Sequence, residues 1–134
     1  MKGTGFTYKI LVFSLLILEG EFTVRLRNAG GKLSTKQFRY IADIVQEYEL
    51  TLVITARAGF QLHDVESDNL LEIWKKLNQD GLTTWQSFGD NIRNIVSDVY
   101  DGVGKYAEIE VYPLIEKMQD YILKNPKYVG MLPR

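Results

Sequence analysis

Arginines placed beside hydrogen-bonding side chains are the residues of this chain best suited to chemistry. They fall in three short segments whose side chains alternate or are interrupted by glycine: Phe22–Arg27, Thr55–His63 and Gly89–Ile95. A guanidinium group stays charged at working pH and presents a planar fork of donors that matches carboxylates and other oxyanions. The segments therefore predict a binding site for anions or carboxylates, and they say more about binding than about reactivity.

The first segment alternates like a half-buried strand, with apolar residues at positions 22, 24 and 26. The opposite face carries Thr23, Arg25 and Arg27, so the two guanidinium groups lie two residue rises apart, about 7 Å. One planar anion, or two carboxylates of one ligand, can bridge such a pair. The alternative is a solvated sheet face whose arginines pair with surface carboxylates, because exposed strands commonly carry Arg and Thr.

The second segment repeats the arrangement. Thr55 and Arg57 share one parity, and beyond a glycine break Gln61 and His63 share a face, so four polar groups can line one side. His63 is the only histidine of the chain, so the sequence gives little support to a metal site made of histidines or to a Ser-His-Asp triad. Its alternative role is that of a hydrogen-bonded histidine within a sheet.

The third segment allows two roles for its arginine. Arg93 can bind a ligand or form a local pair with Asp90, and the sequence favours neither. The glycine pairs elsewhere do not form a phosphate loop, because Gly30-Gly31 and Gly102-Val-Gly104 lack the required frames. Nucleotide hydrolysis is therefore unsupported.

Composition narrows the classes of protein. The 134 residues carry a formal net charge of −1, with 46% hydrophobic and 25% charged residues, which suits one globular domain and gives no basic footprint for nucleic acid. With no cysteine, the chain offers no disulfide, no thiolate zinc site and no ligands for an iron–sulfur cluster. The longest apolar run, Ile10–Leu18, is about half the length of a membrane-spanning helix, so we expect no membrane association and a cytoplasmic protein.

Two helices have clear start signals. Ser34 and Gln37 form a capping box ahead of an apolar stripe that ends at Tyr48. Tyr112 and Pro113 occupy the first turn of another helix, which Asn125-Pro126 would end. The apolar stripe of that helix comprises Leu114, Ile115, Met118, Tyr121 and Ile122.

Between these helices the pattern changes from strand to helix. Leu50–Ala56 and Phe60–Val65 predict two adjacent strands or one bent ribbon with Arg57 at the bend. A further helix should be capped by Ser67 or Asp68 and stopped by a glycine at position 81. Its expected buried stripe comprises Leu70, Leu71, Trp74 and Leu77. This order of elements predicts an α+β protein with a two-layer sandwich, whereas residues 82–99 give no clear signal.

Five segments, taken in order, resemble those of siroheme-dependent nitrite and sulfite reductases: residues 22–37, 55–63, 81–84, 89–95 and 132–134. The resemblance covers about Gly20 to Arg134. It implies a ferredoxin-like half-domain that, in complete enzymes, packs against a related half-domain and helps to enclose siroheme. Residues 20–134 would form this half-domain, and residues 1–19 would form an N-terminal extension or an edge strand.

The resemblance also implies roles for individual residues. Arg25 resembles the arginine that faces the distal side of the siroheme and contacts the anionic substrate, and Arg93 resembles a second substrate-facing arginine. The residues that resemble the ribbon holding the siroheme carboxylates are Thr55, Arg57, Gln61 and His63. The expected partners are sulfite or nitrite and the remaining domains or subunit of the reductase.

The family's cysteine motifs are missing from these residues. In the family they hold a four-iron four-sulfur cluster and the proximal ligand of siroheme, so we do not expect this chain to reduce its substrate alone. A non-catalytic module that binds a tetrapyrrole or another anion on the same arginines is the alternative, and an inert structural domain would bind neither. An isolated half-domain would also leave apolar surface uncovered, and we expect Ile10–Leu18 at the contact of a two-fold homodimer.

Overall fold

The computed structural model describes residues 13–14, 21–84, 92–105, 108–125 and 127–128. Its elements, in chain order, are strand β1 (Phe13–Ser14), strand β2 (Glu21–Leu26), the 3-10 turn η2 (Ala29–Gly31), helix α1 (Thr35–Glu47), strands β3 (Thr51–Ile54) and β4 (Phe60–Glu66), helix α2 (Leu70–Gln79) and helix α3 (Tyr112–Lys124).

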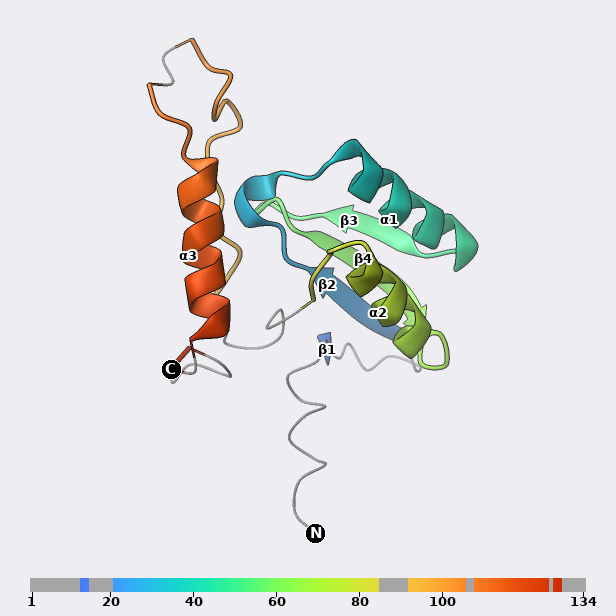
Figure 1. Ribbon diagram of the computed structural model, residues 1–134. Helices are drawn as coiled ribbons and strands as arrows, with labels where there is room; N and C mark the ends of the chain where they lie inside the picture. Colours follow the sequence, from blue (N-terminus) through green and yellow to red (C-terminus); the bar gives the residue numbers. More distant parts are fainter. Residues whose placement is uncertain (1–12, 15–20, 85–91, 106–107, 126, 129–134) are drawn as a thin grey trace.

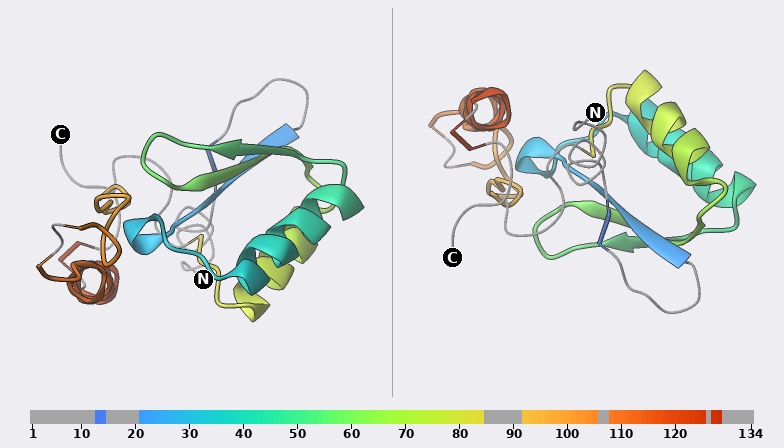
Figure 2. Two further views of the ribbon diagram at one scale, coloured as in Figure 1. Left: turned by 90° about the horizontal axis from the view of Figure 1, so that it is seen from above. Right: turned by 90° about the horizontal axis from the view of Figure 1, so that it is seen from below.

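The strands form one antiparallel sheet in the order β1-β2-β4-β3. Strands β2 and β3 both run antiparallel to β4, so they are parallel to each other, and α1 makes the crossover between them. Helices α1 and α2 cover the same face of the sheet, and no described helix covers the other face (Figures 1 and 2). The predicted α+β class and two-layer ferredoxin-like sandwich are confirmed.

The core lies between the sheet and the two helices that cover it. Strands β2 and β4 contribute their apolar face, and each helix contributes the residues that point toward it. The most deeply buried apolar side chains are Val24, Ile41, Ile44, Leu62, Val65, Ile73 and Leu77. Because one face of β2 is committed to this core, Thr23 and Arg25 belong to the opposite face of the sheet.

Strand β4 contains a β-bulge. Its pairing register with β2 slips between Phe22 and Val24, which leaves His63 and Asp64 opposite the single residue Thr23. Asp64 takes the extra position with a φ of 65°. The buried side of β4 therefore passes from even to odd positions, and Phe60–Val65 does not alternate throughout as its sequence predicts.

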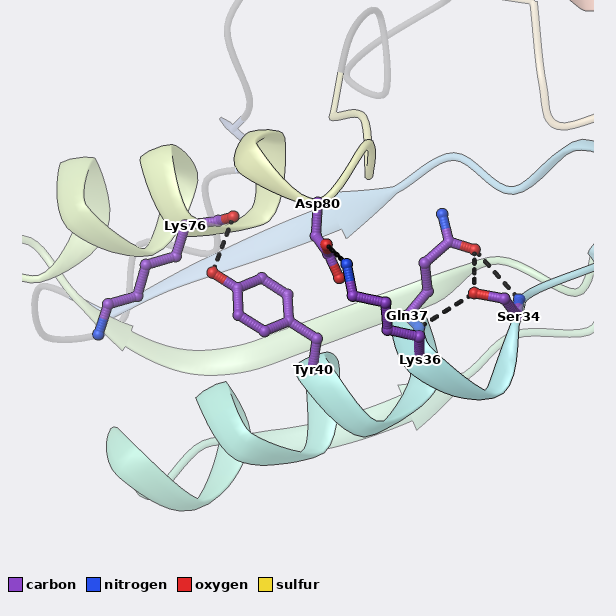
Figure 3. A network of polar contacts seen from close by, with 6 residues as sticks. All are labelled: Ser34, Lys36, Gln37, Tyr40, Lys76 and Asp80. Carbon is purple, nitrogen blue, oxygen red and sulfur yellow. Dashed lines mark hydrogen bonds and ion pairs between the residues drawn. The ribbon is translucent and has the colours of Figure 1, made fainter.

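Polar contacts fix α1 and join it to α2 (Figure 3). The predicted capping box is present: Gln37 N–H donates to Ser34 Oγ at 3.1 Å, and Ser34 N–H donates to Gln37 Oε1 at 3.1 Å. Between the helices, Tyr40 Oη donates to the Lys76 carbonyl at 3.1 Å. These bonds supplement the apolar contacts and set how the two helices lie on the sheet.

Helix α2 differs from its prediction at the start and in its buried stripe. Its N-cap is Asn69 rather than Ser67 or Asp68, because Glu66 accepts a bond from Asn69 N–H and the chain turns before the helix begins. With that start, 3.6-residue periodicity brings Leu70, Ile73, Trp74 and Leu77 toward the core. Leu71 is 61% exposed, so its predicted burial is wrong.

Gly81 follows α2 with a φ of 76°, as expected of a helix-ending glycine. Beyond it, residues 92–98 have no regular secondary structure.

Helix α3 lies beside η2 instead of on the sheet (Figure 1). Asp101 accepts bonds from the N–H groups of Val111 and Tyr112 at 2.7 and 2.9 Å, which satisfies donors at the helix start. Only Ile115 of the predicted stripe is buried. Leu114, Met118 and Tyr121 are 58%, 46% and 63% exposed, because the sheet does not meet this helix. None of the described helices is both long and apolar enough to span a bilayer.

Most of Ile10–Leu18 lies outside the described residues. Its described part, Phe13–Ser14, pairs with β2 at one edge of the sheet. The proposed role of this segment in a homodimer stays a prediction.

Candidate functional site

The turn between β3 and β4 positions Arg57. Thr55 Oγ1 accepts from Gly59 N–H at 3.1 Å and donates to the Gly59 carbonyl at 3.0 Å, while Ala58 N–H donates to the Thr55 carbonyl at 2.9 Å. The predicted ribbon is thus two adjacent strands joined by a closed turn. The Thr55 hydroxyl makes both of these bonds within the turn, and the Arg57 side chain is exposed at its tip.

A second segment, residues 92–97, lies across the 3-10 turn. The Arg27 guanidinium donates to the Ile92 carbonyl through Nη2. Gly30 N–H donates to the Ile95 carbonyl at 2.9 Å, and Ser97 Oγ donates to the Gly30 carbonyl at 3.3 Å. These bonds hold the backbone on both sides of Arg93 against the end of β2.

Two asparagines join the three segments. Asn94 Nδ2 donates to the Asn28 carbonyl at 2.6 Å and to the Arg57 carbonyl at 3.0 Å. Asn28 N–H donates to Asn94 Oδ1 at 3.2 Å, and Asn28 Nδ2 donates to the Ala58 carbonyl at 3.4 Å. The end of β2, the hairpin tip and the segment around Arg93 therefore meet at these two carboxamides.

Glycine makes this close approach sterically feasible. Gly31 has a φ of 74°, and a Cβ atom at this position would lie 2.7 Å from the Cβ of Ala58. Gly30 has a φ of 61°, and a Cβ atom there would lie 2.9 Å from Cδ2 of Tyr112. A larger residue at position 31 would push the turn away from the hairpin, and one at position 30 would push it away from α3.

The three segments and the end of the sheet enclose an open pocket of about 400 Å³. Its wall contains four arginines and none of the acidic residues that the structure describes. The lining residues are Arg25, Leu26, Arg27, Thr55, Ala56, Arg57, Gly59, Phe60, Gln61, Ile92, Arg93 and Asn94. The wall thus combines guanidinium groups from strands and loops with residues of apolar type, a composition that suits a ligand with an apolar body and anionic edges.

The electrostatics of the pocket favour an anion. Burial lowers the pKa of Arg25, and the positive charge of Arg93 lowers this pKa further. The same two causes, in the same order, lower the pKa of Arg27. No carboxylate among the described residues forms an ion pair with Arg25, Arg57 or Arg93. Arg25 Nε is buried and has no hydrogen-bond partner among the residues that the structure describes.

Gln61 pairs with Arg25 across β2 and β4, so both side chains lie on the sheet face away from the helices. His63 lies behind Gln61 and is absent from the pocket wall. Its Nε2 is 3.0 Å from Gln61 Oε1, and its Nδ1 is 3.4 Å from Thr23 Oγ1. With the proton on Nε2, His63 donates a hydrogen bond to the amide oxygen of Gln61. The amide N–H groups of Gln61 are then available to donate to a ligand.

The structure brings together five of the six residues to which the family resemblance gives a role. Arg25, Arg57, Arg93, Thr55 and Gln61 line one pocket, and His63 does not. Asp90, the alternative partner of Arg93, lies outside the described residues.

Sequence reasoning missed Asn28 and Asn94 as organisers of the site. An Asn next to an arginine in two separate segments was the available signal, but only the fold shows that they touch. Among the described residues no group of three or more His, Asp or Glu side chains is arranged to hold a metal ion.

Comparison with known proteins agrees with this architecture. The family model described as "Nitrite/Sulfite reductase ferredoxin-like half domain" matches residues 18–80. The structure of the Mycobacterium tuberculosis NirA protein superimposes with a TM-score of 0.74 and 28% sequence identity, over 82% of this chain and 20% of that one.

Curated relatives include both kinds of reductase. The ferredoxin–nitrite reductase of Leptolyngbya laminosa is 33% identical over 116 residues, which are 85% of this chain and 23% of the relative. A ferredoxin sulfite reductase of Mycolicibacterium paratuberculosis is 32% identical over 114 residues, which are 84% of this chain and 20% of the relative. The chain spans about a fifth of the length of these relatives. Over residues 18–80 it matches the ferredoxin-like half-domain of nitrite/sulfite reductases, and its fold is similar to that of the NirA protein.

Proposed function

We propose that this chain supplies the siroheme- and substrate-facing half-domain of a nitrite or sulfite reductase. Arg25 and Arg93 would bind the substrate anion, and Arg57 and Gln61 would bind siroheme carboxylates. The observation that carries the proposal is the pocket of about 400 Å³, whose wall gathers arginines without an acidic residue among the described ones. Like charges are costly to bring together, so an anionic ligand is the simplest compensation.

The residues present fit a siroheme-like ligand. Siroheme carries eight carboxylates on a flat apolar ring, and the pocket offers guanidinium forks in a wall that also includes Leu26, Phe60 and Ile92. The buried Nε–H group of Arg25 has no hydrogen-bond partner among the described residues and can donate to a ligand. When bound, siroheme would supply the redox-active iron, while this chain would supply charge and position.

The proposed roles of the side chains differ by exposure. Arg57 sits at an exposed hairpin tip and can follow a carboxylate at the ring edge, whereas Arg25 is half-buried on the sheet and gives a fixed donor. Arg25 and Arg93 would stabilise the negative oxygens of nitrite or sulfite through hydrogen bonds in a site of reduced dielectric constant. Thr55 would act by closing the turn, and His63 would act by orienting Gln61.

Reduction of the substrate needs groups that this sequence lacks. The 134 residues contain no cysteine, so a four-iron four-sulfur cluster and a thiolate ligand to siroheme must come from other sequence. The absence of cysteine also favours one other candidate, a module that binds a tetrapyrrole or other anion without redox chemistry. A coding sequence that continues in frame into a cysteine-bearing region would support the reductase, and a stop codon after Arg134 would support the module.

Ligand binding tests the proposal directly. Siroheme is titrated into the full chain and followed by its absorbance, with R25Q, R57A and R93A as pocket variants. Each should weaken binding by about 1–3 kcal/mol, the scale of a lost charged hydrogen bond. R39A is the matched control, because Arg39 is an exposed arginine of α1 outside the pocket. Equal affinity in all four variants and the wild type would contradict the assignment.

A further inference from the structure

The carboxamide of Asn94 touches the backbone of every loop that brings an arginine to the pocket. Its Nδ2 donates to the carbonyls of Asn28 and Arg57, and its Oδ1 accepts from the N–H of Asn28. Asn28 follows Arg27 in the chain, and Asn94 follows Arg93. One side chain thus joins three backbone segments, each of which carries a pocket arginine at the contact or one residue away.

Other bonds fix two of these segments without Asn94. The Arg27 guanidinium and the backbone of Gly30 already hold residues 92–95 against the end of β2. The hairpin tip has fewer such ties: its internal bonds close the turn between Thr55 and Gly59 but do not attach it to its neighbours. Asn94 and Asn28 make the hydrogen bonds that attach the described tip to the rest of the site.

We propose that Asn94 is the positioning residue of the anion site, which sets the Arg57 guanidinium relative to Arg25 and Arg93. This inference rests on the proposed function of the pocket. Arg57 is exposed and carries a long side chain, so its aim depends on where the backbone of the tip lies. Without the bond at 3.0 Å to its carbonyl, the tip would sample positions in which the guanidinium misses its ligand.

The chemistry of the carboxamide explains why asparagine suits this position. Both N–H donors face carbonyl oxygens and the amide oxygen faces an N–H group, so all three bonds form at once. Alanine removes all three bonds. Serine keeps a polar group beside Asn28 but has a single donor, which cannot serve two carbonyls equally.

A double-mutant cycle separates positioning from mere stability. The probe is uroporphyrin III, a metal-free tetrapyrrole with eight carboxylates, and its fluorescence is followed as wild type, N94A, R57A and N94A/R57A are added. We expect N94A to weaken binding about tenfold, in the range for groups that hold a binding side chain in place, and by no more than R57A does. In the R57A background N94A should change the affinity less than twofold, because the guanidinium that it positions is gone.

Two controls complete the cycle. N78A is the matched asparagine variant, since Asn78 donates to the Trp74 carbonyl on α2 at 2.7 Å and lies outside the pocket wall, and it should bind like the wild type. N94S repeats the cycle if N94A does not fold, as judged by circular dichroism before titration.

The outcomes distinguish this inference from the proposed function. If R57A binds uroporphyrin III as tightly as the wild type, the assignment of the pocket fails, and the inference fails with it. If R57A binds weakly but the Asn94 variants bind normally, the positioning role alone is refuted. The same follows if N94A weakens binding equally with and without Arg57, because a purely structural residue would behave in that way.

Discussion

Replacing Gly31 by alanine should destabilise the protein through two separable causes. The backbone at this position has a φ of 74°, where an L-residue costs about 1–2 kcal/mol. The new Cβ would also lie 2.7 Å from the Cβ of Ala58, far inside the usual carbon–carbon contact of about 3.5–4 Å, and overpacking of this kind costs about 1–3 kcal/mol. Together the free energy of unfolding should fall by about 2–5 kcal/mol.

Gly81 provides the matched control. Its φ is 76°, and nothing lies within 4 Å of a Cβ added there, so G81A should cost only the conformational part, about 1–2 kcal/mol. The difference between G31A and G81A then measures the contact with Ala58. Urea unfolding followed by circular dichroism gives both values, provided that the slope with denaturant does not change between variants.

Removal of the clashing methyl group tests the geometry itself. Ala58 has a φ of 52°, which glycine tolerates, so A58G should be close to neutral. In the double variant G31A/A58G the contact at 2.7 Å cannot form, and the loss should return to that of G81A. A cost for G31A no greater than that for G81A, or a double variant as unstable as G31A, would refute the close approach of the turn to the hairpin.

Three further predictions use the same unfolding assay. T55V should lose about 1–2 kcal/mol and T55S should not, because the Thr55 hydroxyl donates to and accepts from Gly59 at 3.0 and 3.1 Å; equal losses would contradict this. Glu47 raises the pKa of Lys76, so this ion pair stabilises the fold below the ordinary lysine pKa of about 10.4. The stabilisation is lost as the pH rises above that value. The difference in unfolding free energy between wild type and K76M should therefore be constant from about pH 6 to 9 and shrink above about pH 10. R93Q should stabilise the free chain at low salt while weakening siroheme binding, because burial lowers the pKa of Arg25 and the positive charge of Arg93 lowers it further by repulsion. A destabilised free R93Q would argue against this repulsion.

The fold could be predicted largely because local signals agree with the tertiary arrangement. The capping box of Ser34 and Gln37, the helix-ending Gly81 and the alternation along β2 each act within a few residues, and the structure has all three. The errors arose where contacts between residues far apart in the sequence decide which side chains are buried. The apolar stripe of α3 predicts burial, yet Met118 is 46% exposed, because periodicity shows which residues share a face but not what that face meets.

The candidate site was predictable by residue type but not by assembly. Arginines with hydrogen-bonding neighbours pointed to an anion site, and parity placed Arg25 and Gln61 each on the polar face of its own segment. The strand pairing in the structure shows that these two faces coincide. Nothing local shows that the segment around Asn94 crosses the hairpin tip, since the contact joins residues 37 positions apart in the chain. The bulge at Asp64 likewise escaped prediction, because it depends on the register between two strands.

The clustering of arginines that would bind an anion also destabilises the free chain, because their positive charges repel one another. The glycine turn and the two asparagines bring the backbone segments of Arg27, Arg57 and Arg93 together. Burial lowers the pKa values of Arg25 and Arg27, and the nearby positive charge of Arg93 lowers them further. A free chain must bear the repulsion between guanidinium groups, and an anion that binds them relieves it. Ligand binding should therefore stabilise the fold by more than its contacts alone would suggest, and this extra stabilisation should diminish as salt screens the repulsion in the free chain.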